Sequence, residues 1–162
     1  MSPTLRAAGP EDGPAIWAIL EPVVRAGETY ALDRDMSRDA VLAYWLGADR
    51  ASFVAEANGQ VRGTYYLRAN QAGGGAHVAN CGYATHPEAR GQGIARAMAE
   101  HSFAEERTRG FHAMQFNFVV SSNASAVRLW QALGFETVGR VPEAFHHPAL
   151  GLVDALVLYR RL

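Results

Sequence analysis

Two glycines lie where a strand-like run gives way to a helical pattern, in Arg90-Gly91-Gln92-Gly93-Ile94-Ala95. Glycine leaves the neighbouring main-chain N–H groups unobstructed, and the start of a helix adds positive potential at the same point. Such a turn can hold a phosphate or a pyrophosphate. A lone glycine-rich match is weak evidence, and its alternative is a loop of no special purpose. The rest of the chain therefore has to decide between the two.

Two asparagines interrupt otherwise apolar strand-like runs, Asn80 within 77–85 and Asn117 within 111–120. Buried amides are costly unless they are paired, so two of them beside a cleft suggest a bound partner. A ligand carboxylate could accept hydrogen bonds from both NH₂ groups. The alternative is that each asparagine bonds to local backbone.

Strands and helices must position these residues. The pattern predicts strands at 4–7, 52–57, 61–69, 77–85, 111–120, 135–141 and 152–159, with the segment around 146–148 as a loop between the last two. Helices are predicted after Gly9, over 37–45, from Gly93 to Gly110 and from Asn123 to Gly134.

Two connections in this pattern fix the topology. Asn58-Gly59 predicts an antiparallel hairpin. The strand, helix and strand across 77–120 predict a right-handed parallel unit, which puts the glycine loop at the carboxyl end of a strand, where open α/β sheets bind ligands. Glu100, Glu105 and Glu106 fall mostly outside the apolar side of the third helix.

Composition favours one compact domain spanning 1–162, since 49% of the 162 residues are hydrophobic. With 15 Lys and Arg against 16 Asp and Glu, no global positive field exists to hold nucleic acid or an anionic membrane.

No apolar run could span a bilayer, no signal peptide is indicated, and the histidines lack metal-ligand spacing. The single cysteine, Cys81, fits a core position in a cytoplasmic protein.

Three motifs in order resemble the GCN5-related N-acetyltransferase (GNAT) superfamily over essentially the whole chain. They are Arg90-x-x-Gly93-x-Ala95, the strand end Tyr83-Ala84-Thr85-His86-Pro87, and the segment 123–135. The resemblance implies a mixed α/β fold, with a central mixed twisted sheet of six to seven strands and four flanking helices. It also implies acetyl-CoA as co-substrate, while the spacing of the histidines gives no reason to expect a metal.

By this resemblance, the N–H groups of Gln92 to Ala95 would hold the pyrophosphate, and backbone groups of Ala84 and Thr85 would pair with the pantetheine arm. A backbone N–H at or next to Thr85 would stabilise the oxyanion. Asn123 would contact the cofactor, cap its helix, or do both. The implied cofactor-binding set is Tyr83, Ala84, Thr85, Arg90, Gly91, Gln92, Gly93, Ile94, Ala95, Asn123 and Trp130, and Arg96 and Arg128 are further candidates for the phosphates.

One departure concerns Trp130, because members of this superfamily often carry a tyrosine there to protonate the leaving thiolate. An indole N–H is far too weak an acid for that role. The usual acid is therefore absent, and we expect Trp130 in the core. The absence leaves a non-catalytic CoA-binding regulatory module as one alternative.

A narrower resemblance concerns the acceptor. The segment 112–117, Asn123 and the tryptophan at 130 resemble fungal N-acetyltransferases that detoxify the proline analogue azetidine-2-carboxylate. In that family two strand asparagines, matched by Asn80 and Asn117, hold the small cyclic amino acid. The ending 145–162 resembles phosphinothricin-type acetyltransferases. We therefore expect acetylation of a small amino acid or imino acid, in detoxification.

Other outcomes stay open. The segment 123–135 is shared with ribosomal-protein acetyltransferases, so acetylation of a peptide N-terminus is the alternative within enzymes. Family members are often dimers, which makes the C-terminal hairpin a candidate homodimer interface.

The acceptor amine must lose a proton before it attacks, so a base or a water path is needed. The candidate bases are Glu28, Tyr30, His86 and His146, and for each the alternative is a solvated loop or turn residue. The predicted catalytic set is Asn80, Thr85, Glu28 and Tyr30.

Overall fold

The structure is a computed structural model that describes residues 2–162. Its strands are β1 (Thr4–Ala7), β2 (Ala51–Ala57), β3 (Gln60–Ala69), β4 (Val78–Thr85), β5 (Ala113–Val120), β6 (Glu136–His147) and β7 (Gly151–Arg161). Its helices are α1 (Gly13–Ala26), α2 (Arg38–Trp45), α3 (Ile94–Thr108) and α4 (Ala124–Ala132), with short 3₁₀ turns η1 (Pro10–Asp12), η2 (Gly73–Gly75) and η3 (Pro87–Ala89). The strands form one mixed sheet in the order β1-β2-β3-β4-β5-β7-β6. This confirms the predicted fold class.

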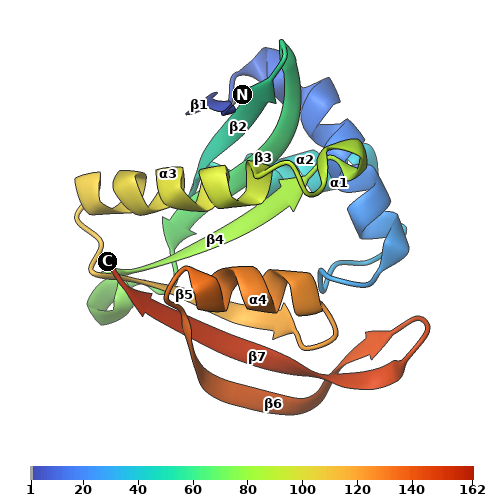
Figure 1. Ribbon diagram of the computed structural model, residues 1–162, viewed down its shortest axis with the longest axis vertical. Helices are drawn as coiled ribbons and strands as arrows, with labels where there is room; N and C mark the ends of the chain where they lie inside the picture. Colours follow the sequence, from blue (N-terminus) through green and yellow to red (C-terminus); the bar gives the residue numbers. More distant parts are fainter. Residues whose placement is uncertain (1) are drawn as a thin grey trace.

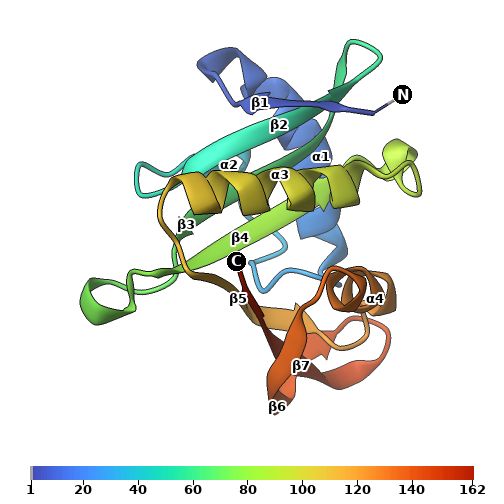
Figure 2. The same cartoon turned by 60° about the vertical axis from the view of Figure 1, so that its left-hand side comes forward.

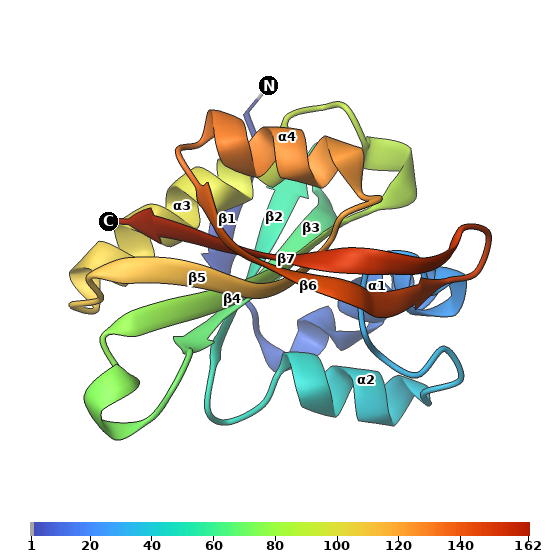
Figure 3. The same cartoon turned by 90° about the horizontal axis from the view of Figure 1, so that it is seen from below.

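Helices cover both faces of the sheet. Figure 3 shows α3 and α4 above the sheet and α1 and α2 beneath it. Side chains of successive strand residues alternate between the faces, so Tyr65 packs in the core beside α3 while Tyr66 packs in the core beside α1 and α2. None of the helices within 2–162 combines the length and the apolar character that crossing a membrane requires.

The hairpin predicted at Asn58-Gly59 is confirmed. Asn58 and Gly59 have φ angles of 53° and 73°, and β2 and β3 pair in antiparallel register on either side of them. Positive φ at both central residues is the geometry of the type I′ turn, whose twist matches that of the flanking strands.

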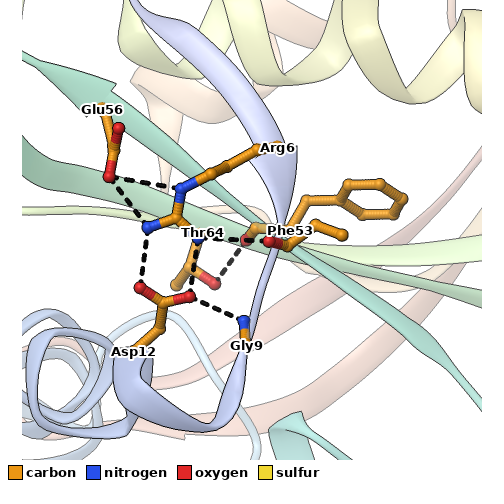
Figure 4. Close-up of polar contacts among 7 residues, drawn as sticks. Arg6, Gly9, Asp12, Phe53, Glu56 and Thr64 are labelled. Carbon is orange, nitrogen blue, oxygen red and sulfur yellow. Dashed lines mark hydrogen bonds and ion pairs between the residues drawn. The ribbon is translucent and has the colours of Figure 1, made fainter.

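A charged cluster ties β1 to the first helical turns (Figure 4). The two Nη atoms of Arg6 each donate to one oxygen of Asp12 at 2.8 Å, and Nη2 also lies 2.8 Å from Glu56 Oε1 on β2. The N–H of Gly9 donates to Asp12 Oδ2 at 2.7 Å. The bonds from Arg6 lower the pKa of Asp12 below its usual value. Asp12 therefore stays ionised at neutral pH and fixes the entry into α1.

The sheet opens between its two central parallel strands. β4 and β5 pair only at Val78 with Ala113 and at Ala79 with Met114. Beyond these pairs the strands diverge, as Figures 1 and 2 both show. The far half of β4 therefore has a neighbour on the β3 side alone.

The C-terminal hairpin differs from the prediction. The segment expected to be a loop is mostly strand, since β6 continues to His147 and β7 starts at Gly151. β6 is an edge strand with an irregular register between Val141 and Phe145, and Glu143 has a φ of 50°. An edge position and a bulge tolerate the missing N–H of Pro142. Proline therefore bends this strand without ending it.

Candidate active site

A cleft of about 1070 Å³ lies where β4 and β5 diverge. It is lined by the segment between α1 and α2, by β4, by the glycine loop, by β5 and by the start of α4. The predicted residues that it brings together are Glu28, Tyr30, Asn80, Tyr83, Ala84, Thr85, Arg90, Gly91, Gly93, Ile94, Ala95, Arg96, Asn117, Asn123 and Trp130. The predicted residues Gln92, His86, His146 and Arg128 are not in its lining.

The glycine loop presents main-chain N–H groups to the cleft. Gly91 and Gly93 have φ angles of 75° and 80°, a conformation that L side chains rarely adopt. The first main-chain bond of α3 runs from Ala97 N–H to Gly93 O. The three preceding N–H groups, from Ile94 on, therefore have no carbonyl partner within the helix. Together with the helix dipole, these donors have the chemistry to bind an anion.

Gln92 is not part of the cleft lining. Its side chain donates to Glu88 O at 3.2 Å, away from the cleft.

The register between β3 and β4 decides which groups of β4 face the cleft. Asn70 N–H donates to Val78 O and His86 N–H donates to Arg62 O, both at 2.8 Å. In an antiparallel pair, hydrogen-bonded positions recur at every second residue. The even-numbered residues of β4 therefore bond to β3, and the odd-numbered residues turn their N–H and C=O groups toward the cleft.

This register corrects the expectation for Ala84. Ala84 is paired with Thr64, so the N–H and C=O groups of Ala84 both point toward β3 and bond to it. Tyr83 and Thr85 are the residues whose main-chain groups face the cleft. A ligand rich in amides could bond to this edge in place of a strand.

Tyr30 is attached to the same edge. Its hydroxyl donates to Tyr83 O at 2.7 Å, and burial raises the pKa of the Tyr30 phenol well above its usual value. A phenol that stays protonated and donates its proton to a carbonyl does not fit the expectation that Tyr30 is a base. Its role is to hold the segment between α1 and α2 against β4.

Asn80 and Asn117 both line the cleft, and both also have local partners. Asn80 is 8% exposed, and its Nδ2 donates to Gln115 O at 3.0 Å just past the last paired residues of β4 and β5. Asn117 Nδ2 donates to Asn70 Oδ1 at 2.6 Å, and its Oδ1 accepts from Gln115 Nε2 at 3.0 Å. Asn80 therefore bonds to the main chain, which was the alternative to ligand binding, whereas Asn117 bonds to the side chains of Asn70 and Gln115.

The histidines are arranged differently from the expectation. His86 Nδ1 accepts the N–H of Glu88 at 3.2 Å and so caps η3. His146 is exposed on β6, whereas its neighbour His147 lines the cleft. His147 Nδ1 accepts the N–H groups of Ala149 and Leu150 at 3.1 and 3.2 Å. Sequence reasoning named His146 and missed His147, because which of two adjacent residues faces the cleft depends on the strand that they belong to.

Trp130 is a core residue, as the helical spacing predicts. It is 7% exposed, and its ring centroid lies 4.9 Å from that of Tyr83 and 4.6 Å from that of Phe116. Asn123 occupies the position before α4, but its side chain accepts no main-chain N–H. The capping role expected for the Asn123 side chain is therefore not seen.

Behind β4, on the α3 side, lies a buried acid. Glu106 is 0% exposed, although the sequence placed it away from the apolar side of α3. Cys81 Sγ donates to Glu106 Oε1 at 3.0 Å, and Oε2 has no partner among the described residues. Burial raises the pKa of Glu106 to about 7.

The cleft lining also contains residues that sequence reasoning did not single out. They come from segments far apart in the chain and are Leu32, Tyr44, Tyr66 and Arg68. No motif connects them. Residues 2–162 contain no cluster of three or more side chains suited to hold a metal ion.

Comparisons with known proteins give a consistent result. The model of the acetyltransferase (GNAT) family matches residues 17–135. The solved structure of a GCN5-related N-acetyltransferase from Kribbella flavida is 40% identical with a TM-score of 0.94, covering 99% of this chain and 98% of that one. A GNAT superfamily phosphinothricin acetyltransferase from Sinorhizobium meliloti, solved in complex with acetyl-CoA, is 25% identical with a TM-score of 0.87 over 100% of this chain and 89% of that one.

A curated relative is the N-acetyltransferase aca1 of Schizosaccharomyces pombe. It is 25% identical over 137 residues, covering 75% of this chain. The match spans 66% of aca1, just under two thirds of its length.

Proposed function

The chain belongs to the acetyltransferase (GNAT) family, and we propose that it transfers an acetyl group from acetyl-CoA to the amine of a small amino acid or imino acid. The observation that carries this proposal is one continuous cleft. It joins the free N–H groups of the glycine loop, the unpaired edge of β4, and the two asparagines Asn80 and Asn117.

The donor end of the cleft fits acetyl-CoA. The N–H groups at the start of α3, with Arg90 and Arg96 beside them, would hold the pyrophosphate. The main-chain groups of Tyr83 and Thr85 would pair with the amides of the pantetheine arm, because β5 has moved away from them. Each donor on this edge then finds an acceptor on the ligand.

The reaction follows from this placement. The neutral amine attacks the thioester carbonyl carbon, a C–N bond forms, and the C–S bond breaks to release the thiolate. A cleft-facing N–H of β4 stabilises the oxyanion. Within residues 2–162, Glu28 is the one carboxylate in the cleft lining, and we assign it the proton of the acceptor ammonium, directly or through water. The attacking nitrogen loses its remaining N–H proton as the amide forms, and the thiolate takes up a proton from that nitrogen or from solvent, since Trp130 cannot supply one.

Two features favour a small amino acid as acceptor. The cleft lining includes Leu32, Tyr44 and Tyr66, whose apolar surfaces could contact a small ring or side chain of the acceptor. The similar structure from Sinorhizobium meliloti is named a phosphinothricin acetyltransferase, and phosphinothricin is a small amino acid. Acetylation of a toxic amino-acid analogue would remove its free amine, so we propose a role in detoxification. We also propose that the chain forms one domain and acts in the cytoplasm.

Release of free thiol from acetyl-CoA tests this function. We expect release with azetidine-2-carboxylate, proline or phosphinothricin, and little with a peptide that begins with alanine. Turnover with the peptide alone would replace the small-molecule acceptor by a protein N-terminus. Tight acetyl-CoA binding without thiol release from any amine would instead support a regulatory module.

An Asn117→Ala variant locates the acceptor. We expect a higher KM for the acceptor, by about tenfold for one lost hydrogen bond to a carboxylate, with acetyl-CoA affinity unchanged. The matched control is Gln131→Ala, an exposed amide on α4 outside the cleft. An equal loss of affinity for acceptor and acetyl-CoA would argue against the carboxylate role of Asn117.

A further inference from the structure

Arg68 is a charged residue at the acceptor end of the cleft for which the reaction described above has no use. It lies on β3 directly opposite Asn80 on β4, so the two side chains project from the same face of the sheet. Arg68 is 31% exposed and lines the cleft together with Asn80, Asn117 and Tyr66.

The guanidinium of Arg68 is poorly satisfied. It makes no hydrogen bond with any described residue, and its Nε is buried without a partner. Its nearest carboxylate is that of Asp49, with Nη1 at 3.7 Å from Oδ2. Of its five N–H donors, the one on Nε is buried without a partner among the described residues, and an unpaired buried donor is costly. The part of the guanidinium that solvent reaches lines the cleft and is open to an acceptor from outside the chain.

The charge of Arg68 is not cancelled locally. Asp49 already accepts from Arg50 Nε at 3.0 Å, and Arg50 stands over the rings of Tyr44 and Tyr66 at 4.9 and 4.6 Å. Burial raises the pKa of the Tyr66 phenol, so this ring stays neutral. Two guanidinium groups therefore share one carboxylate, and the cluster keeps a net charge of +1.

The two asparagines cannot supply this charge. The Nδ2 of each asparagine already donates to a partner within the chain, that of Asn80 to Gln115 O and that of Asn117 to Asn70 Oδ1. Their remaining capacity is neutral, and a neutral amide does not distinguish strongly between a carboxylate and a carboxamide.

We propose that Arg68 is the residue that selects an acceptor carrying a free carboxylate, by pairing its guanidinium with that carboxylate beside Asn80. This inference rests on the proposed function and specifies its substrate class. The planar guanidinium suits a carboxylate in a bidentate arrangement. A peptide N-terminus has an amide where the amino acid has its carboxylate, so Arg68 also disfavours peptides.

The test compares two acceptors that differ only in this group, azetidine-2-carboxylate and azetidine-2-carboxamide. The variants are Arg68→Gln and Arg68→Lys in the full chain. Arg62→Gln is the matched control, because Arg62 lies on the same strand, pairs only with the exposed Glu88, and is outside the cleft. Denaturation midpoints and acetyl-CoA affinity are measured for every variant.

We expect Arg68→Gln to lower kcat/KM for the carboxylate by about 10- to 100-fold, the range for a hydrogen bond to a charged group. Turnover of the carboxamide and affinity for acetyl-CoA should not change. Arg68→Lys should recover part of the loss, and Arg62→Gln should behave as the parent protein.

Three results would overturn the proposal. If Arg68→Gln lowers kcat/KM equally for the carboxylate and the carboxamide, Arg68 has a structural role. If kcat/KM falls for neither acceptor, Arg68 is not part of the acceptor site. In both cases the parent protein still acetylates the small acceptor, and the proposed function stands. If the parent protein acetylates neither compound nor any other small amino acid, the proposed function fails and the role of Arg68 fails with it.

Discussion

Replacing Glu106 by glutamine should stabilise the protein above pH 7 and leave its stability near pH 4.5 almost unchanged. The carboxyl group is fully buried under β4, and its one hydrogen bond comes from Cys81. Burial disfavours the ionised form, so the folded protein keeps the proton on Glu106 up to a pH of about 7. The unfolded chain loses this proton near its ordinary pKa of 4.5.

The sign and the size follow from this difference. Between the two pKa values the folded state binds more protons than the unfolded state, so the stability of the protein falls as the pH rises through this window. A rise in pKa from 4.5 to about 7 corresponds to roughly 3 kcal/mol, at about 1.4 kcal/mol for each pKa unit. Glutamine has nearly the same shape and cannot ionise, so the Glu106→Gln variant should not lose this free energy.

Urea denaturation at several pH values between 4.5 and 8.5 measures the effect. The free energy of unfolding of Glu106→Gln minus that of the parent protein should grow across the window and then level off. Glu100→Gln is the control, since Glu100 is exposed on the same helix and pairs with Arg96 at 3.6 Å. Parallel pH curves for Glu106→Gln and the parent protein would refute the assignment of a raised pKa to this carboxyl.

Three further changes have defined outcomes. Gly82→Ala would place a Cβ 2.5 Å from Cε2 of Tyr66, so we expect a loss of about 1 to 3 kcal/mol in the free energy of unfolding, and an unchanged melting temperature would contradict the close packing. Tyr30→Phe removes the donor to the β4 carbonyl and should cost about 1 kcal/mol without altering the pH–rate profile, and loss of one limb of that profile would restore Tyr30 as a base. Asp12→Asn breaks the ion pair with β1 and should cost about 2 to 3 kcal/mol at pH 7. Because the folded-state pKa of Asp12 is lowered, the parent protein loses this contribution as the pH falls through that pKa, and an equal cost of Asp12→Asn in strong acid would contradict the pairing.

Local signals predicted most of the fold. The Asn58-Gly59 turn and the glycine loop each depend on backbone conformations that few residue types adopt, so a short stretch of sequence was sufficient. The extent of β6 was not predictable in this way. Pro142 argues for a loop within its own segment, and only the edge position of the strand makes it tolerable.

Asn80 and Asn117 were singled out from their own strands and both line the cleft, but Arg68 was not singled out. The glycine loop and the end of β4 are contiguous in sequence, whereas Arg68 meets Asn80 only through the pairing of β3 with β4. The expectation for Ala84 was wrong by one position, because the direction of its main-chain groups depends on the register and not on the motif.

Glu106 was misjudged through its residue type. It continues the buried series of every fourth residue on α3, namely Ile94, Met98, Ser102 and Glu106. Helical periodicity alone would have placed it inside, and its charge suggested the surface.

The narrow contact between β4 and β5 has a consequence for the mechanics of the molecule. The strand ladder joins the part of the sheet that contains β1 to β4 to the part that contains β5 to β7 through two paired residues on each strand. Hydrogen bonds from Asn80 to Gln115 O, from Asn117 to Asn70 and from His112 N–H to His77 O add to this junction. A ligand bound in the cleft between β4 and β5 would contact both parts of the sheet. Ligand binding should therefore reduce the motion of the two parts relative to each other. Amide hydrogen exchange at the paired ends of β4 and β5 should slow when a ligand is bound.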